Sequence, residues 1–414
     1  IKSSSSIGAG KDGIQMVTYP SDWTPMQLRD IGYIQMCRRI FQSQTKAYGA
    51  IPFYKISTFG GKADAYISQE LYEKYKLLYP YPEKGDVLIS AAGTIGKTVI
   101  FDGKDSYFQD SNIVWLKVDK EVIDRKFLWW FYRSFPWDAL EGTTIQRLYN
   151  SIILETKIHL PDKPEQEEIA RTLSQFDTYI DDLAELIEKK KGIREGALED
   201  LITKKTRLDG YADDWAPVTF NQVIIPKARI GWQGLKKHEY LRSGYSYLIG
   251  GTDFSNGTVS LDNISYVTKE RYDMDTNIQV SANDVLVTKD GTIGKVAIVP
   301  ELNKPATLNS GVFVFRTNSR LVPAFLFRVL QSSVFREFID TLSAGSTIKH
   351  LYQKDLKKFE FEIPVDTKEQ EAIAAVLTAM DEEIRDLETE RDKIIQIREG
   401  AMDDLLTGRV RLTK

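Results

Sequence analysis

The second half of this chain repeats the first half, and this duplication constrains the fold more than any other feature of the sequence. The run GDVLISAAGTIGK at residues 85–97 returns as NDVLVTKDGTIGK at residues 283–295. Three further pairs follow in the same order: GTTIQRLY (142–149) and GSTIKHLY (345–352), EQEEIA (165–170) and EQEAIA (369–374), and REGALEDLIT (194–203) and REGAMDDLLT (398–407). Four matched blocks in one order predict a single structural unit that the chain uses twice.

Each copy begins with a globular part. Segments 18–160 and 211–363 contain short β-branched runs, such as residues 86–90, separated by Gly and Pro. This pattern is typical of short strands joined by loops. Apolar runs at 127–135 and 324–338 predict one helix in each copy. The expected fold class is therefore α+β, with two tandem globular domains of mixed strands and short helices.

Each copy ends with a long helix, in segments 161–210 and 364–414. Apolar residues recur there at steps of four and three residues, which is the spacing of a coiled-coil seam. The predicted seam consists of Ile169, Leu173, Phe176, Ile180, Leu183, Ile187, Ile373, Leu377, Met380, Ile384 and Leu387. Neither helix can bury this stripe alone, so we expect the two to pack as an antiparallel coiled coil with internal pseudo-two-fold symmetry. The alternative is that each helix folds back on its own globular part.

Charge is distributed unevenly over these parts. The whole chain has a net charge of −4, but residues 18–160 and 211–363 each hold 18 Lys and Arg against 16 Asp and Glu. The two helical segments are acidic, and residues 1–17, which begin with a run rich in Ser and Gly, are expected to be a disordered lead-in. A polyanion such as DNA would therefore meet the globular parts rather than the helices.

Basic and amide side chains gather in the segments that differ most between the copies, residues 34–61 and 223–257. Arg and Lys can hold phosphates there, and Arg, Asn and Gln can read base edges. Together with polar residues of the repeated loops, the candidate DNA contacts are Arg38, Arg39, Gln42, Gln44, Lys46, Lys62, Lys97, Arg147, Lys227, Arg229, Gln233, Lys236, Lys237, Arg242, Lys289, Lys295 and Lys349. For any single one of these residues, the alternative interpretation is a solvated surface charge.

The sequence patterns of an active site are missing from both copies. GTIGKT at 93–98 resembles the end of a phosphate-binding P-loop, but Ala91 stands where that loop needs Gly, and Val296 stands in the second copy where it needs Ser or Thr. A strand–turn–strand is the favoured interpretation. Three scattered His residues predict no metal site, and the single Cys37 excludes a disulfide framework and suits a reducing cytoplasm. No apolar stretch reaches the roughly 18–20 residues that a membrane span needs.

The duplicated order of the blocks, with GTIGK, then EQ-x-x-IA, then REGA-x-x-DL-x-T, resembles the specificity subunit of type I restriction-modification enzymes. The resemblance implies that the globular parts are target recognition domains, each of which reads one half of a bipartite site on double-stranded DNA. It implies that the helices are spacers that set the gap between the half-sites and dock two modification (methyltransferase) subunits, through which restriction subunits join. S-adenosylmethionine, ATP and Mg²⁺ would belong to those partners. This chain itself would bind no cofactor and catalyse no reaction, and it would act in the cytoplasm of a bacterium or archaeon.

Two other classes of function compete with this interpretation. A coiled-coil protein scaffold or adaptor without DNA specificity would also explain two globular parts joined by helices, and it predicts partner binding that does not depend on DNA. A nucleotide-hydrolysing enzyme that uses GTIGK predicts ATP binding that is lost in Lys97→Ala.

Overall fold

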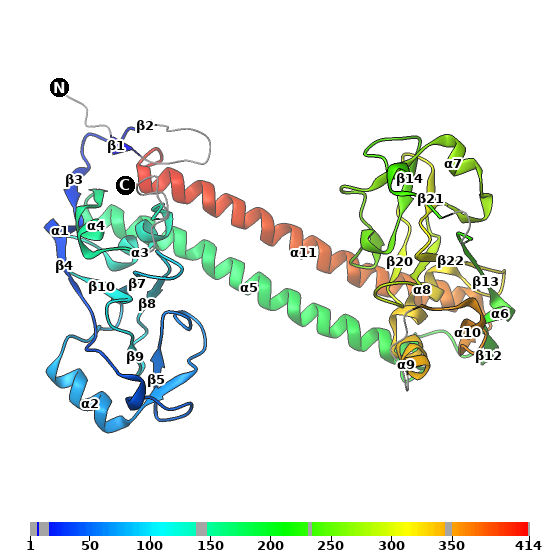
Figure 1. Ribbon diagram of the computed structural model, residues 1–414, viewed down its shortest axis with the longest axis horizontal. Coiled ribbons are helices and arrows are strands. Elements are labelled where there is room, and N and C mark those ends of the chain that lie inside the picture. Colours follow the sequence, from blue (N-terminus) through cyan, green and yellow to red (C-terminus); the bar gives the residue numbers. More distant parts are fainter. Residues whose placement is uncertain (1–5, 8–15, 138–146, 231–233, 344–349, 413–414) are drawn as a thin grey trace. The chain divides into compact units, whose positions relative to one another are not determined.

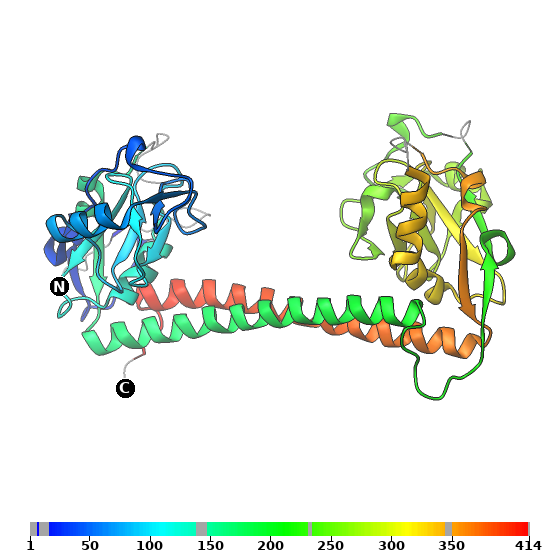
Figure 2. The same cartoon turned by 90° about the horizontal axis from the view of Figure 1, so that it is seen from below.

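The computed structural model describes residues 6–7, 16–137, 147–230, 234–343 and 350–412 (Figures 1 and 2). The chain forms two compact units. The first unit combines Ile1–Ala184 with Thr389–Lys414, and the second is Glu185–Glu388. Two long helices, α5 (Lys163–Ile202) and α11 (Thr367–Thr407), contribute one part to each unit. Each unit therefore contains one globular domain, the start of one long helix and the end of the other. Within the described part of the chain, no helix is long and apolar enough to cross a membrane.

The first globular domain is built on two small sheets. The larger sheet is antiparallel with strand order β4-β10-β7-β8, and the smaller has order β6-β5-β9. These strands are β4 (Gly32–Gln35), β5 (Ile51–Tyr54), β6 (Ala65–Ile67), β7 (Val87–Ser90), β8 (Thr98–Ile100), β9 (Tyr107–Phe108) and β10 (Ile113–Val118). Strands β7 and β10 are buried along almost their whole length, because their runs VLIS and IVWLKV are apolar on both faces.

Two strand pairs and several short helices complete this part of the chain. Strand β3 (Thr24–Gln27) enters the domain and pairs with β11 (Lys157–Leu160), which leaves it. Strands β1 (Ser6–Ile7) and β2 (Met16–Val17) form a separate pair. The helices are α1 (Leu28–Ile31), η1 (Gln42–Gln44), α2 (Gln69–Leu78), α3 (Arg125–Ser134) and α4 (Asn150–Glu155). Helix α3 lies where the sequence predicts a helix, and it is capped by Asp124, whose carboxylate accepts the Phe127 amide at 2.9 Å.

The second globular domain repeats this plan with additions. Its larger sheet has order β13-β22-β19-β20 and is extended by β16 and β15, and its smaller sheet has order β17-β14-β21-β18. The strands are β13 (Ile224–Ala228), β14 (Ser246–Ile249), β15 (Phe254–Ser255), β16 (Thr258–Val259), β17 (Ser265–Val267), β18 (Gln279–Val280), β19 (Val285–Thr288), β20 (Val296–Ile298), β21 (Ala306–Leu308) and β22 (Val312–Thr317). The entering strand β12 (Trp215–Thr219) again pairs with the leaving strand, β23 (Glu360–Pro364).

The helices of the second domain differ from the prediction in one place. They are α6 (Phe220–Val223), η3 (Lys237–Glu239), η4 (Gly251–Asp253), α7 (Lys269–Asp273), η5 (Thr276–Ile278), α8 (Pro323–Gln331), α9 (Ser333–Ser343) and α10 (Gln353–Leu356). The single helix predicted at 324–338 is wrong, because the chain turns at Ser332 and forms α8 and α9. Ser332 is extended and buried, and the carboxylate of Glu199 on α5 accepts the Ser333 amide at 2.8 Å. A tertiary contact thus caps the second helix.

The core of the first domain is completed by both long helices. One buried cluster contains Ile169 and Leu173 from the start of α5, together with Leu405 and Leu406 from the end of α11. A second cluster lies around the smaller sheet and includes Trp115. The first turns of α5 therefore pack on the domain that precedes them, and the last turns of α11 pack on the same domain.

The second domain has the corresponding arrangement. Its main cluster contains Ile373 and Leu377 from the start of α11, and Leu198, Leu201 and Ile202 from the end of α5. Of the other predicted seam residues, Leu183, Ile187 and Ile384 are buried, and Phe176, Ile180, Met380 and Leu387 are half-buried.

Inside each unit, α5 and α11 lie side by side and run in opposite directions (Figures 1 and 2). As residue numbers rise along α5, those of the contacted residues fall along α11. The contacts are Asp177–Arg398 (2.7 Å) and Tyr179–Glu390 (2.5 Å) in the first unit, and Lys191–Glu388 (2.8 Å) and Arg194–Asp381 (2.7 Å) in the second.

The Gln of each repeated EQ pair joins a long helix to its own domain. Gln166 and Gln370 each make three hydrogen bonds to backbone groups: the partners are Val122, Asp124 and Pro161 for Gln166, and Arg320, Val322 and Pro364 for Gln370. Both side chains are buried, so these bonds replace those that water would make.

The Glu of each EQ pair is buried and is bound by an arginine that follows the other long helix. Arg411 donates to both carboxylate oxygens of Glu165 at 2.8 Å, and Arg207 donates to those of Glu369 at 2.8 and 2.7 Å. The side chains of Glu165 and Glu369 are only 2% and 1% exposed. A carboxylate at that depth needs a paired cation and hydrogen bonds in place of its water. The end of each long helix is thereby held at the start of the other.

We predict that Glu369→Ala loosens the start of α11. Removing the carboxylate leaves Arg207 and the Trp215 indole without their shared acceptor, at a cost of about 2 kcal/mol. Amide hydrogen exchange over residues 367–375 should then be about 30-fold faster. The matched control is Lys205→Ala, which removes only an exposed pair with Asp200 and should leave this exchange unchanged. Equal exchange rates in Glu369→Ala and the unmodified chain would contradict the role given to the buried carboxylate.

Candidate nucleic-acid interface

The segments that differ between the copies contribute strands to both sheets of each domain. Segment 34–61 runs from β4 through η1 to β5, whereas segment 223–257 runs from β13 through η3, β14 and η4 to β15. The hairpin of β15 and β16 adds two strands to the edge of the larger sheet next to β20. Loops and edges of this kind allow two domains with one framework to present different surfaces.

The first domain presents most of its candidate residues to solvent. Arg38, Arg39, Gln42, Lys46 and Lys62 are exposed. The guanidinium of Arg38 lies 5.2 Å from the centre of the Tyr79 ring, and that of Arg39 pairs with Asp110 at 2.8 Å. The side-chain oxygen of Gln44 accepts the Phe41 amide within η1.

Exposed aromatic rings lie on the same segment as these cations. The side chains of Phe41 and Tyr48 are 61% and 81% exposed. Cations that hold phosphates and aromatic faces that contact bases or sugars are a combination suited to nucleic acid.

Candidate residues of the second domain differ in their exposure to solvent. Lys236, Lys237 and Arg242 are exposed, and Lys227 is half-buried. Gln233 and Lys349 lie outside the described residues. Arg229, by contrast, is 2% exposed, and its Nε donates to the Leu308 carbonyl at 3.0 Å. Burial, and secondarily the charge of Arg271, lower the pKa of Arg229. We therefore expect Arg229 to support the fold rather than to meet a phosphate.

The GTIGK runs form the same hairpin in both domains. The run at 93–97 joins β7 to β8, and the run at 291–295 joins β19 to β20, both antiparallel. Ser90 and Thr288 occupy the same place: each accepts the lysine amide, of Lys97 or Lys295, at 2.9 Å. Their hydroxyls also donate back to the turn carbonyls of Thr94 and Thr292.

A glycine is required inside this hairpin. Gly96 has φ +79°, and a Cβ there would stand 2.5 Å from Cδ1 of Trp137. The hairpin thus holds Lys97 and Lys295 at an exposed turn between two strands. A P-loop leads into a helix instead.

A second repeated block pairs with this hairpin. Leu148 donates to the Ala91 carbonyl, and Leu351 donates to the Lys289 carbonyl, each at 2.8 Å. Next to Leu148, the guanidinium of Arg147 donates to the Ser111 carbonyl at 2.8 Å.

Lys289, Tyr149 and Tyr352 lie at or next to these backbone hydrogen bonds. Lys289 is half-buried over the Phe313 ring, and burial lowers its pKa. Tyr149 and Tyr352, which follow the paired leucines, are 62% and 53% exposed. Two of the four matched blocks therefore meet at one place in each domain.

Most of the candidate cations are free of acidic partners. In the portion that the structure describes, Arg39 is the one candidate cation with an ion pair. The exposed ones, such as Lys46, Lys97 and Lys236, keep their charge available for an external anion. No cluster of three or more His, Cys, Asp or Glu residues suited to a metal ion occurs among the described residues. Burial raises the pKa of the Cys37 thiol to about 12.

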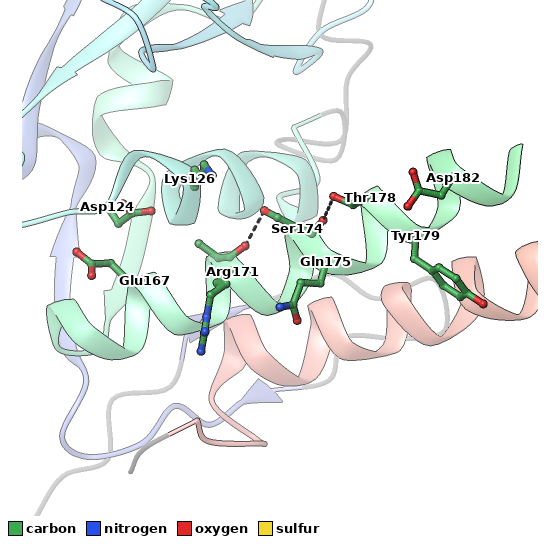
Figure 3. Close-up of a pocket in the computed structure, with 10 residues that line it drawn as sticks. Asp124, Lys126, Glu167, Arg171, Ser174, Gln175, Thr178, Tyr179 and Asp182 are labelled. Atoms are coloured by element: carbon green, nitrogen blue, oxygen red, sulfur yellow. Dashed lines mark hydrogen bonds between the residues drawn. The ribbon is translucent and has the colours of Figure 1, made fainter. Parts of the chain in front are cut away.

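A groove in the first unit runs along α5 beside the start of α3 (Figure 3). It is lined by Asp124, Lys126, Glu167, Ala170, Arg171, Ser174, Gln175, Thr178, Tyr179 and Asp182. At the corresponding positions of α11, the second copy has Ala375, Ala379 and Glu383 in place of Arg171, Gln175 and Tyr179. The groove is therefore not a site that both copies share.

Sequence reasoning missed the charged residues that join the domains to the helices. These are Glu165, Arg207, Glu369 and Arg411, described above, and two aspartates, Asp177 and Asp381, that each bind two arginines. A signal was available, since the repeat continues beyond the matched blocks into R-L at 207–208 and 411–412.

The comparison with protein families matches both copies. The family model described as "Type I restriction modification DNA specificity domain" covers residues 20–192 and 214–397.

Similar proteins have names consistent with this match. A proposed type I restriction enzyme specificity subunit of Haemophilus influenzae is 52% identical over 160 residues, 39% of this chain and 42% of that protein. A proposed type I restriction enzyme specificity subunit of Methanocaldococcus jannaschii is 27% identical over 95% of both chains. The first alignment therefore spans less than half of its relative, and the second spans nearly all of it.

Solved structures share the fold. The type I restriction-modification S subunit of Mycoplasma genitalium has a TM-score of 0.58 at 17% identity, covering 92% of this chain and 96% of that one. A chain from a study of complex assembly in the type I restriction-modification system has a TM-score of 0.56 at 14% identity, covering 95% and 100%. With both of its copies matched by the family model, this chain belongs to the type I restriction-modification DNA specificity family.

Proposed function

We propose that this chain is the DNA-recognition subunit of a type I restriction-modification enzyme, and that each globular domain reads one half of a bipartite target. The observation that carries this function is the match of the DNA specificity family to both copies, at residues 20–192 and 214–397. A relative from Methanocaldococcus jannaschii, matched over 76% of both chains, is named as a type I restriction enzyme specificity subunit.

In each copy, the globular part and the long helix would have different roles. Residues 18–160 and 211–363 form the target recognition domains, and segments 161–210 and 364–414 form spacers that pack as an antiparallel coiled coil with pseudo-two-fold symmetry. The burial of Leu183, Ile187 and Ile384 and the opposite directions of α5 and α11 within each unit support this packing. A stiff spacer suits a protein that must hold two half-sites at one separation, because a flexible linker would tolerate many.

Sequence preference would come from the segments that differ between the copies. Exposed cations such as Lys46, Lys62, Lys236, Lys237 and Arg242 can hold phosphates or read bases there. The hairpins that carry Lys97 and Lys295 are the same in both domains, so we assign them to contacts with the DNA backbone, which is the same in every sequence.

Catalysis would belong to partner subunits. Two modification (methyltransferase) subunits would dock on the helices and bind S-adenosylmethionine, and restriction subunits that use ATP and Mg²⁺ would join through them. This chain would bind no cofactor, and the complex would act in the cytoplasm of a bacterium or archaeon. A structural neighbour that comes from work on the assembly of a type I system supports an assembled role. The scaffold without DNA specificity is less favoured, because the matched family is one of DNA specificity domains.

Adenine-methylation mapping tests this function. A plasmid library would be exposed to the methyltransferase encoded beside this chain, with and without the chain. We expect a bipartite methylated motif that vanishes when the chain is left out. Methylation that is absent, or identical without the chain, would favour the scaffold.

Lys97→Ala and Lys295→Ala should weaken DNA binding without changing the motif. Each variant removes one exposed cation from a repeated hairpin. The slope of log affinity against log salt concentration should therefore become shallower by about 0.9 for each phosphate that the variant no longer neutralises, measured with the complete methyltransferase complex. Lys104→Ala, which removes an exposed lysine outside the hairpin, is the control. A changed base preference in Lys97→Ala would contradict a backbone contact.

A chain with two copies of the first domain should recognise a palindrome. The entering and leaving strands pair at Thr24–Leu160 and at Trp215–Pro364, so the first domain can replace the second between these ends. A two-fold symmetric protein reads a two-fold symmetric site, so methylation mapping should show the first half-site inverted across the gap. The same half-site in direct repeat would refute the pseudo-two-fold arrangement, and the unmodified chain provides the reference motif.

A further inference from the structure

Each globular domain is joined to both long helices by one aspartate that binds two arginines. In the first unit, Asp177 on α5 binds Arg398 on α11 through one carboxylate oxygen and Arg133 on α3 through the other, both at 2.7 Å. A single carboxylate therefore connects three elements: the domain, its own helix and the opposite helix.

The second unit contains the same arrangement. Asp381 on α11 binds Arg194 on α5 at 2.7 Å through one oxygen and Arg328 on α8 at 2.5 Å through the other. Asp177 corresponds to Asp381, and Arg398 to Arg194, at the matching positions of the two copies. We call each set an Asp-centred joint: Arg133–Asp177–Arg398 in the first unit, and Arg328–Asp381–Arg194 in the second.

The domain's arginine comes from a different position of the helix in each copy. In the first copy, the Trp130 indole donates to the Ser174 hydroxyl on α5 at 3.3 Å, and Arg133 donates to Asp177. In the second copy, Arg328 stands at the position of Trp130, and Gln331 stands at that of Arg133. The link from the domain to the aspartate is thus present in both copies, although the arginine that provides it lies three residues earlier in the helix of the second copy.

Stability alone does not explain why both copies keep this link. Replacing paired charges in a partly buried site by packed apolar residues is often neutral or stabilising. Arg328 is only 4% exposed at its side chain, and its Nε has no hydrogen-bond partner among the described residues. The joints therefore cost desolvation, and their value lies in allowing one arrangement of the three elements.

That selectivity follows from the geometry. A slip of one helix by a single turn moves a side chain about 5.4 Å along the axis, which is beyond hydrogen-bond reach. Apolar side chains along the helices tolerate such slips far better than a carboxylate that must meet two guanidinium groups.

We propose that Asp177 and Asp381 are positioning residues that hold each recognition domain at one place on the helix pair, and thereby make the complex selective for one gap length between its half-sites. This inference rests on the proposed DNA-recognition function. Neither aspartate needs to touch DNA.

The test measures methylation of sites that differ only in gap length. Once the unmodified complex has defined the motif, plasmids carrying both half-sites with the native gap or a gap changed by one base pair are methylated by complexes containing Asp177→Asn or Asp381→Asn. We expect the preference for the native gap to fall about tenfold, the change that about 1.4 kcal/mol of coupling produces, with both half-sites unchanged.

Tyr179→Phe and Glu388→Gln are matched controls. Each removes a hydrogen bond or ion pair between the same two helices, Tyr179 with Glu390 and Lys191 with Glu388, but neither residue contacts a domain arginine. Both should keep the native gap preference.

Arg133→Gln covers the case in which an aspartate variant does not fold. The Arg133 side chain is 30% exposed, and besides its ion pair with Asp177 it lies over the Trp129 and Trp130 rings of its own helix. Its replacement removes the link between domain and helix and should also relax the gap. Methylation that falls equally at every gap, or an unaltered preference in Asp177→Asn, Asp381→Asn and Arg133→Gln, would overturn the positioning role. An unmodified complex without any bipartite motif would instead refute the proposed function, and this inference with it.

Discussion

The burial of both long helices in each globular core is the constraint on which the rest of the structure depends. A helix of 40 residues with one apolar stripe needs a partner surface to stay folded in water. Here Ile169 and Leu173 from α5 and Leu405 and Leu406 from α11 enter one core. Because each core receives residues from both helices, each domain is bound to the helix pair and not only to the helix that follows it in sequence.

Charged groups give this apolar arrangement its definite register. Apolar contacts stabilise any arrangement that buries apolar surface, so they discriminate weakly between neighbouring registers. A buried carboxylate, in contrast, requires its hydrogen-bond donors at fixed places. Glu165 and Glu369 hold the ends of the opposite helices, and Asp177 and Asp381 join domain and helices further along. The function proposed above, in which two DNA half-sites are held at one separation, would need such discrimination more than additional stability.

Repeated and unrepeated residues serve different purposes in this chain. The repeated ones include Gln166 and Gln370, which bind each long helix to its own domain, and the hairpins that carry Lys97 and Lys295, so they form a frame common to both domains. The unrepeated segments combine buried strands, such as β5 and β14, with loops whose exposed side chains can differ without disturbing the core. One frame with two different surfaces is what recognition of two different half-sites requires.

The sequence by itself determined the duplication, the positions of the long helices and the class of function, because matched blocks and apolar periodicity are properties of the chain read in order. It also located the exposed cations near Arg38 and Lys236. Tertiary structure alone decided the break at Ser332, the burial of Arg229 and the Asp177 and Asp381 joints. Periodicity shows which face of a helix is apolar but not what covers it, and a basic residue in a polar segment looks the same whether it faces solvent or a carbonyl. Those outcomes depend on contacts between residues far apart in sequence, and only the folded chain brings them together.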